Sequence, residues 1–198
     1  MITAILLLLF CLLMPAIWRK KMPSDRYRRH RRYRQNAERV LCRLTALDSD
    51  GARLKYLRKI NPYVFEELLL LAFERQGLLV VRNQTYSSDG GLDGQVFIDG
   101  KRWLIQAKRY RRTISPQHIR EFGELITREQ CCGFFIHTGR TGSKSVNYLQ
   151  CWRTIQLISG QRLLDLLAGR QCWYHRPVTK SVAGQPVVTS QCARRSYE

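Results

Sequence analysis

The sequence predicts an α/β fold with one core, preceded by a single membrane-spanning helix. Three observations support this: an uncharged apolar run at the N-terminus, a helix with a buried stripe over residues 61–77, and a two-residue turn between strand-like segments at Asp99-Gly100. With 198 residues, the chain has the length of one domain with extensions. The formal net charge of +19 excludes a neutral scaffold and predicts a polyanionic partner, either nucleic acid or anionic lipid head groups.

The apolar run extends from Ile2 to Trp18, at the short end of the roughly 17 to 25 residues that a spanning helix needs. The basic sequence RKK follows it at once. A secretory signal peptide carries its positive charge before the apolar run, so residues 1–18 are predicted to be an anchor. Because every nearby basic residue follows the run, the positive-inside rule predicts a single-pass protein of the cell inner membrane with a cytoplasmic C-terminal domain.

Residues 19–60 are predicted to form a basic juxtamembrane segment and a helical connector. Nine basic residues and one acidic residue lie between Arg19 and Gln35. Two interpretations fit: a topology signal that also rests on anionic lipid, which we favour, and an arm that binds DNA. From Glu38 to Ile60, apolar residues recur at three- and four-residue spacing and predict two short helices.

Residues 61–77, NPYVFEELLLLAFERQG, carry the signals of one helix. Asn61 and Pro62 are typical of an N-cap and a first helical position, and Gly77 is typical of a C-terminal stop. Glu66 and Glu67 lie in the first turns, where carboxylates suit the positive end of the helix dipole. The predicted buried stripe beside them contains Phe65, Leu68, Leu69, Ala72 and Phe73.

After a strand at residues 78–82, the turn Asp99-Gly100 predicts a β-hairpin, because a type I′ turn needs positive φ at both central positions. Pairing Ile98 with Lys101 then determines the register. A bulge or a longer loop would shift it by one residue and reverse the two faces. In the expected register, one face of the hairpin is apolar and consists of Val96, Ile98, Trp103 and Ile105.

The opposite face is polar near the open end of the hairpin. Asp93 faces Gln106, and Lys108 is its diagonal neighbour. Two interpretations fit these residues. One is an ion pair from Asp93 to Lys108 that Gln106 bridges. The other is a Mg²⁺ site formed by Asp93, the Gln106 side-chain oxygen and the Ala107 backbone carbonyl, with Lys108 orienting water or offsetting negative charge during phosphodiester hydrolysis.

A family resemblance bears on this choice. The segments FEELLLLAFERQG, SSDGGLDGQV, LIQAKRY, HIREFGELI, GFFIHTG and LISGQRLLDLL resemble, in this order over about residues 61–168, the Mrr-type restriction endonuclease domain of the PD-(D/E)xK nuclease superfamily. The resemblance implies an α-β-β-β-α-β core, with a mixed central sheet flanked by helices, and Mg²⁺-dependent DNA cleavage. It also implies roles for four catalytic candidates: Asp93 as the metal-binding aspartate, Gln106 as the substitute for the second acid, Lys108 as the catalytic lysine, and Glu66 as the glutamate of the helical FE motif.

The remaining patterns agree with this architecture. They predict a helix that Ser115-Pro116 opens, strands at residues 131–139 and 154–159, and a closing helix, so that the nuclease-like domain covers 61–169 and a flexible tail covers 170–198. The candidate phosphate contacts are basic side chains: Arg109, Arg111, Arg112, Arg140 and Lys144.

The expected function is that of a membrane-anchored, Mg²⁺-dependent DNA endonuclease. A homodimer would allow it to cut both strands. The alternative is a catalytically inactive nuclease-fold module that tethers DNA or a DNA-processing assembly to the membrane. Such a module would bind DNA with steep salt dependence and without Mg²⁺-dependent cutting.

Overall fold

The computed structural model describes residues 25–83 and 92–174. The predicted anchor at residues 1–18 lies outside the described residues and remains a prediction, as does the part of the predicted tail from residue 175 onward. The start of that tail is not flexible chain as predicted, because Trp173 is buried in the main core. Within the described ranges, no helix is long and apolar enough to cross a membrane.

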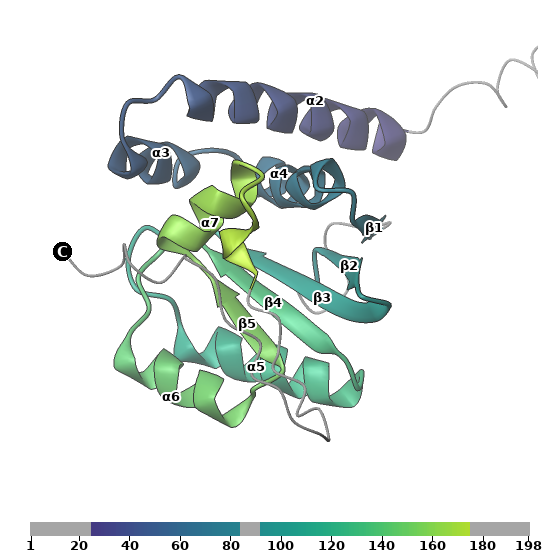
Figure 1. Cartoon of the computed structure of the whole chain (residues 1–198), viewed down its shortest axis with the longest axis vertical. Helices are drawn as coiled ribbons and strands as arrows, with labels where there is room; N and C mark the ends of the chain where they lie inside the picture. The colour runs from purple at the N-terminus through teal and green to yellow at the C-terminus, as the bar shows by residue number, and fades with distance from the viewer. Residues whose placement is uncertain (1–24, 84–91, 175–198) are drawn as a thin grey trace, which may run out of the picture.

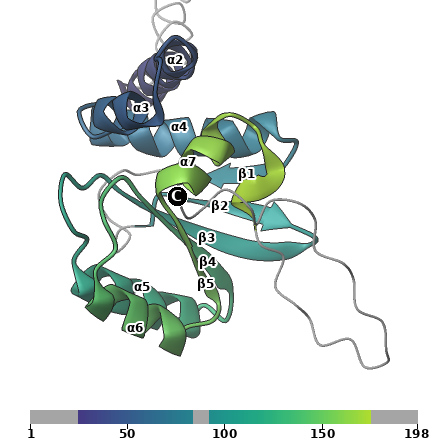
Figure 2. The same cartoon turned by 60° about the vertical axis from the view of Figure 1, so that its left-hand side comes forward.

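The described residues form a five-stranded sheet with helices on both faces (Figures 1 and 2). The strand order is β1-β2-β3-β4-β5. The first three strands are antiparallel to one another, and β4 and β5 are added in parallel, so the sheet is mixed as expected.

The order of the elements along the chain contains the predicted α-β-β-β-α-β core, as α4-β1-β2-β3-α5-β4. The elements are α2 (Asp25–Thr45), α3 (Asp50–Leu57), α4 (Pro62–Arg75), β1 (Leu79–Arg82), β2 (Gly94–Ile98), β3 (Lys101–Lys108), α5 (Pro116–Arg128), β4 (Cys132–His137), α6 (Ser143–Cys151), β5 (Ile155–Ile158), α7 (Gly160–Leu167) and the 3-10 helix η1 (Gln171–Trp173).

The predicted hairpin register is confirmed. Ile98 pairs with Lys101, and Gly94 pairs with Ile105. Asp99 and Gly100 have φ values of 51° and 73°, as a type I′ turn requires. The local chemistry of two turn residues therefore determines which side chains of β3 face each side of the sheet.

Each face of the sheet is covered by its own apolar cluster. In Figures 1 and 2, α4 and α7 cover one face, while α5 and α6 cover the other. Ile105 of β3 and Phe134 of β4 belong to the first cluster, and Leu104 and Phe135 belong to the second. The sequence patterns did not predict α6, because Ser145 is its only fully buried residue and no apolar stripe marks it.

Helix α2 is the main departure from the expected organisation. The basic segment and the first connector helix form one continuous helix that begins at Asp25, well before Glu38. This helix lies on the outer side of α4, away from the sheet (Figures 1 and 2). Its apolar residues join the main core: Ala37, Val40, Leu41 and Leu44 are all buried. Much of the segment assigned to a juxtamembrane connector is therefore packed on the nuclease-like domain.

We expect Leu41→Ala to lower the free energy of unfolding by about 2 to 5 kcal/mol, because the substitution leaves a cavity between α2 and α4. Denaturant unfolding of the full chain, followed by tryptophan fluorescence, measures this loss. The control is Cys42→Ala, one residue further along and exposed, which should change stability little. Equal stabilities for wild type and Leu41→Ala would mean that α2 is not part of the core.

Candidate active site

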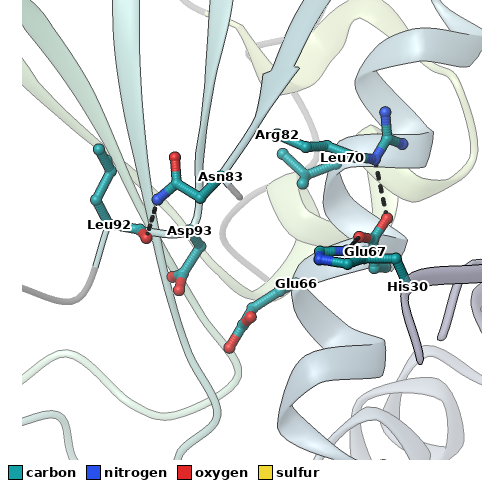
Figure 3. Close-up of a pocket in the computed structure, with 8 residues that line it drawn as sticks. All are labelled: His30, Glu66, Glu67, Leu70, Arg82, Asn83, Leu92 and Asp93. Carbon is teal, nitrogen blue, oxygen red and sulfur yellow. Dashed lines mark hydrogen bonds and ion pairs between the residues drawn. The ribbon is translucent and has the colours of Figure 1, made fainter. Parts of the chain in front are cut away.

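The catalytic candidates meet where α4 approaches the open end of the β2–β3 hairpin. A small pocket lies there, and Glu66 of α4 and Asp93 before β2 both line it. In Figure 3 their carboxylates project into the space between the helix and the sheet. The complete lining consists of His30, Glu66, Glu67, Leu70, Arg82, Asn83, Leu92 and Asp93.

Asp93 is held in place by the backbone of β3. Its N–H donates to the Ile105 carbonyl over 2.9 Å, and its Oδ2 accepts from the Ala107 N–H over 2.6 Å. Both bonds lie just beyond Gly94 and Ile105, the last pair of the ladder between β2 and β3. In the described chain no ion pair within 4.0 Å joins Asp93 to Lys108. The direct contact of this carboxylate is therefore a backbone amide of β3.

The glycine that follows Asp93 allows α4 to approach the sheet. A Cβ atom on Gly94 would lie 2.7 Å from Leu70 Cδ2 and 3.3 Å from the Val81 carbonyl oxygen. Because these distances are shorter than normal contacts, a larger residue would force the Leu70 side chain of α4 or the backbone of β1 to shift. The Asp93-Gly94 pair thus combines a carboxylate with the close packing that brings Glu66 near it.

Lys108 and Gln106 complete the predicted set on β3. Gln106 is buried, with 4% exposure, and pairs with Phe135 of β4. Lys108 is the last residue of β3, is half-buried, and pairs with His137. Glu66 and Asp93 line the pocket, whereas Gln106 and Lys108 are not among its lining residues. Lys108 lies close enough for its charge to act on both carboxyl groups.

The electrostatics show how closely these groups interact. Burial raises the pKa of Glu66 to about 8, with a further rise from the Asp93 charge, while Lys108 acts in the opposite direction. Burial also raises the pKa of Asp93 to about 6, and the Ala107 N–H and Lys108 partly offset this. Two neighbouring carboxylates that are costly to ionise form a site that an added cation would stabilise.

A divalent cation could draw on oxygen ligands here. No group of three or more His, Cys, Asp or Glu side chains within residues 25–83 and 92–174 could hold a metal ion. The oxygen donors in the pocket are the carboxylates of Asp93 and Glu66, and Gln106 and the Ala107 carbonyl are the candidate donors on β3. Such a set of few carboxylates and neutral oxygens fits Mg²⁺, which keeps several waters.

The sequence did not predict a network of ion pairs and hydrogen bonds next to the site. Glu67 is 2% exposed, and its Oε2 accepts from Arg82 Nε over 3.0 Å. Arg82 also donates to Glu74 over 2.9 Å, and His30 Nδ1 lies 3.5 Å from Glu67 Oε1. The one available signal was the second glutamate of the FEE sequence, which looked like a solvated helix residue.

The pocket also contains Asn83 and Leu92. Asn83 Nδ2 donates to the Leu92 carbonyl over 2.5 Å, so these two residues lie side by side. Arg82 precedes Asn83 and connects the end of β1 to α4 through its ion pairs with Glu67 and Glu74. These contacts hold the end of β1 beside the residue that precedes Asp93.

The candidate phosphate contacts fall into two groups. Arg109 donates to the Arg58 carbonyl over 2.7 Å and so connects the end of β3 to the end of α3. The other four candidates, Arg111, Arg112, Arg140 and Lys144, are exposed. The Arg140 N–H donates to the Arg112 carbonyl over 3.1 Å, which brings the loops after β3 and β4 together. These four side chains are the ones available to a polyanion.

Comparison with known proteins identifies the family of this chain. A family model described as "Restriction endonuclease", of the Mrr catalytic type, matches residues 57–167, which is more than half of the chain. This range contains all four catalytic candidates. No curated protein matches the chain, and no solved structure matches it.

The raised pKa of Glu66 makes stability depend on pH. The folded protein holds this proton more tightly than the unfolded chain, so the free energy of unfolding falls as pH rises from about 4.5 to about 8. We expect Glu66→Gln to stabilise the metal-free protein at pH 9 by about 1 to 3 kcal/mol and to have little effect below pH 4.5. Denaturant unfolding in a chelating buffer measures the difference.

The control for this experiment is Glu124→Gln, whose side chain is 62% exposed on α5. It should leave the pH dependence of stability unchanged. A Glu66→Gln variant that is less stable than wild type at pH 9 would contradict the burial of an uncompensated carboxyl group.

Proposed function

Because the chain belongs to the Mrr-type restriction endonuclease family, we propose that it is a Mg²⁺-dependent DNA endonuclease that hydrolyses phosphodiester bonds. The observation that supports the proposal is the position of Glu66 and Asp93 in one pocket. Burial raises the pKa of both carboxyl groups, and the charge of Lys108 acts on both. An ion pair lowers the pKa of a carboxyl group, whereas burial raises it, and strongly shifted groups cluster at functional sites.

In this proposal Asp93 and Glu66 hold Mg²⁺, together with the Gln106 side-chain oxygen and the Ala107 backbone carbonyl. When bound, Mg²⁺ would supply Lewis-acid chemistry, which polarises a phosphate and makes a bound water more acidic. Asp93 Oδ2 accepts a hydrogen bond from the Ala107 N–H, so Oδ1 would be the oxygen that remains available to a cation. The same hydrogen bond prevents the carboxylate from rotating and fixes its direction.

Lys108 acts on the substrate side of the site. Its charge influences both Glu66 and Asp93, so its ammonium group lies within electrostatic reach of the phosphate that the site would bind. We assign it two tasks: orienting the attacking water and offsetting the negative charge that develops on the phosphate. The exposed Arg111, Arg112, Arg140 and Lys144 would hold the flanking DNA backbone.

The membrane anchor and the homodimer are further proposals that rest on the sequence. The apolar run to Trp18 followed by RKK supports a single span of the inner membrane with the nuclease domain in the cytoplasm. A dimer would supply a second active site for the second DNA strand.

We expect Asp93→Asn and Lys108→Ala in the full chain to reduce Mg²⁺-dependent DNA cutting by at least about 100-fold, because each removes a charge that the transition state needs. Nicking and linearisation of plasmid DNA measure the rate, and fluorescence anisotropy without divalent metal measures binding. Binding should change by less than about threefold, since at most one phosphate contact, that of Lys108, is lost.

The matched control is Asp99→Asn, at the closed end of the same hairpin, where asparagine tolerates the positive φ. It should cut DNA at the wild-type rate. Unchanged cutting by Asp93→Asn would show that the site is assigned wrongly. A wild-type protein that binds plasmid, linear and branched DNA but cuts none of them with Mg²⁺ would instead be the inactive tethering module.

A further inference from the structure

Helix α2 lies outside the family-matched range, yet it is attached to the active-site side of the domain. Besides its buried apolar residues, Arg34 pairs with Glu74 over 3.1 Å, and the rings of Tyr33 and Tyr63 lie 5.4 Å apart. His30 contacts Glu67 and lines the same pocket as Glu66 and Asp93. The N-terminal half of α2 is therefore held at the edge of the candidate active site.

The outward face of α2 is strongly positive. Eight of the 21 residues of the helix are arginine, against two acidic residues, and the helix contains no lysine. Arg29, Arg31 and Arg32, next to His30 in the sequence, are exposed. Arginine binds phosphate through a planar, bidentate guanidinium group and is more weakly hydrated than lysine. A helix that uses arginine alone is thus suited to phosphate oxygens.

The apolar face of the same helix is buried against the domain and is not available to another partner. Ala37, Val40, Leu41 and Leu44 pack in the core, and Tyr27 is the only large hydrophobic side chain exposed on the described part of α2. A helix that lies in a lipid interface needs an apolar face to insert below the head groups. This helix has its apolar face against α4, so a lipid surface could attract it only by charge. The position of His30 in the pocket favours DNA over lipid as the partner.

We propose that α2 is a DNA-binding helix of this nuclease, whose arginines hold the phosphate backbone of a strand that passes over the Glu66–Asp93 pocket. The inference rests on the proposed function, because it uses the same substrate and the same pocket. It adds a binding surface outside the family-matched residues. Glu67 acts as the positioning residue, since it holds His30 of α2 and Arg82 of β1 at once.

The test compares two double variants of the full chain in neutral detergent. Arg29→Gln/Arg32→Gln removes two exposed charges one turn apart beside His30. Arg39→Gln/Arg43→Gln removes two exposed charges one turn apart at the other end of the same helix. Binding of a duplex is measured by fluorescence anisotropy over a range of salt concentrations without divalent metal, and thermal unfolding confirms that both variants are folded.

We expect Arg29→Gln/Arg32→Gln to weaken DNA binding by about tenfold and to reduce the slope of log K against log salt by about 2, one for each lost phosphate contact. The control pair should lose less than about threefold. Equal losses for the two pairs would overturn the proposal, because net charge alone would then explain them. Unchanged DNA affinity would overturn it as well.

A third measurement separates lipid from DNA. The same proteins are compared in micelles with and without added anionic lipid, using the shift in thermal unfolding. If Arg29→Gln/Arg32→Gln abolishes a lipid-dependent shift while DNA affinity stays at the wild-type value, α2 is a lipid-binding helix and the proposal fails. Because binding is measured without metal and cutting with Mg²⁺, a failure of α2 is distinct from a failure of the nuclease function.

Discussion

Two backbone groups of β3 hold Asp93 in place, and the position of Asp93 determines the geometry of the candidate active site. Its N–H bonds to the Ile105 carbonyl, and its carboxylate accepts from the Ala107 N–H. Both bonds exist only in the register that the Asp99-Gly100 turn creates. A shift by one residue would send the side chains of β3 to opposite faces, exchange Leu104 and Ile105 between the two apolar clusters, and separate Lys108 from the carboxylates.

Burying the carboxylates of the site costs the folded protein free energy, and apolar packing elsewhere in the fold offsets that cost. Glu66 and Asp93 lose hydration where α4 meets the hairpin, and this loss raises the pKa of both carboxyl groups. The apolar clusters on the two faces of the sheet hold the helix and the hairpin together despite this penalty. Destabilised carboxylates of this kind are typical of functional sites, because the binding of a cation recovers the lost interaction energy.

Beside these ionisable catalytic candidates lies a second set of charges with a different purpose. Glu67 and Glu74 are paired with Arg82, and α2 adds His30 and Arg34 to the same network. The pairing lowers the pKa of Glu74, chiefly through its hydrogen bond with Arg82, in contrast to Glu66. Adjacent glutamates on one helix therefore have separate tasks: Glu66 faces the site, and Glu67 attaches β1 and α2 to α4.

The sequence by itself determined the features that depend on neighbouring residues. The Asp99-Gly100 turn predicts the hairpin register, the spacing of apolar residues predicts α4, and the order of the motifs predicts the α-β-β-β-α-β core; all three are confirmed. Only the tertiary structure decided that α2 packs on α4 and that Glu67 is buried. His30 and Glu67 are 37 residues apart in the chain, and a contact between distant segments depends on how whole elements pack. No local pattern of charge or hydrophobicity contains that information.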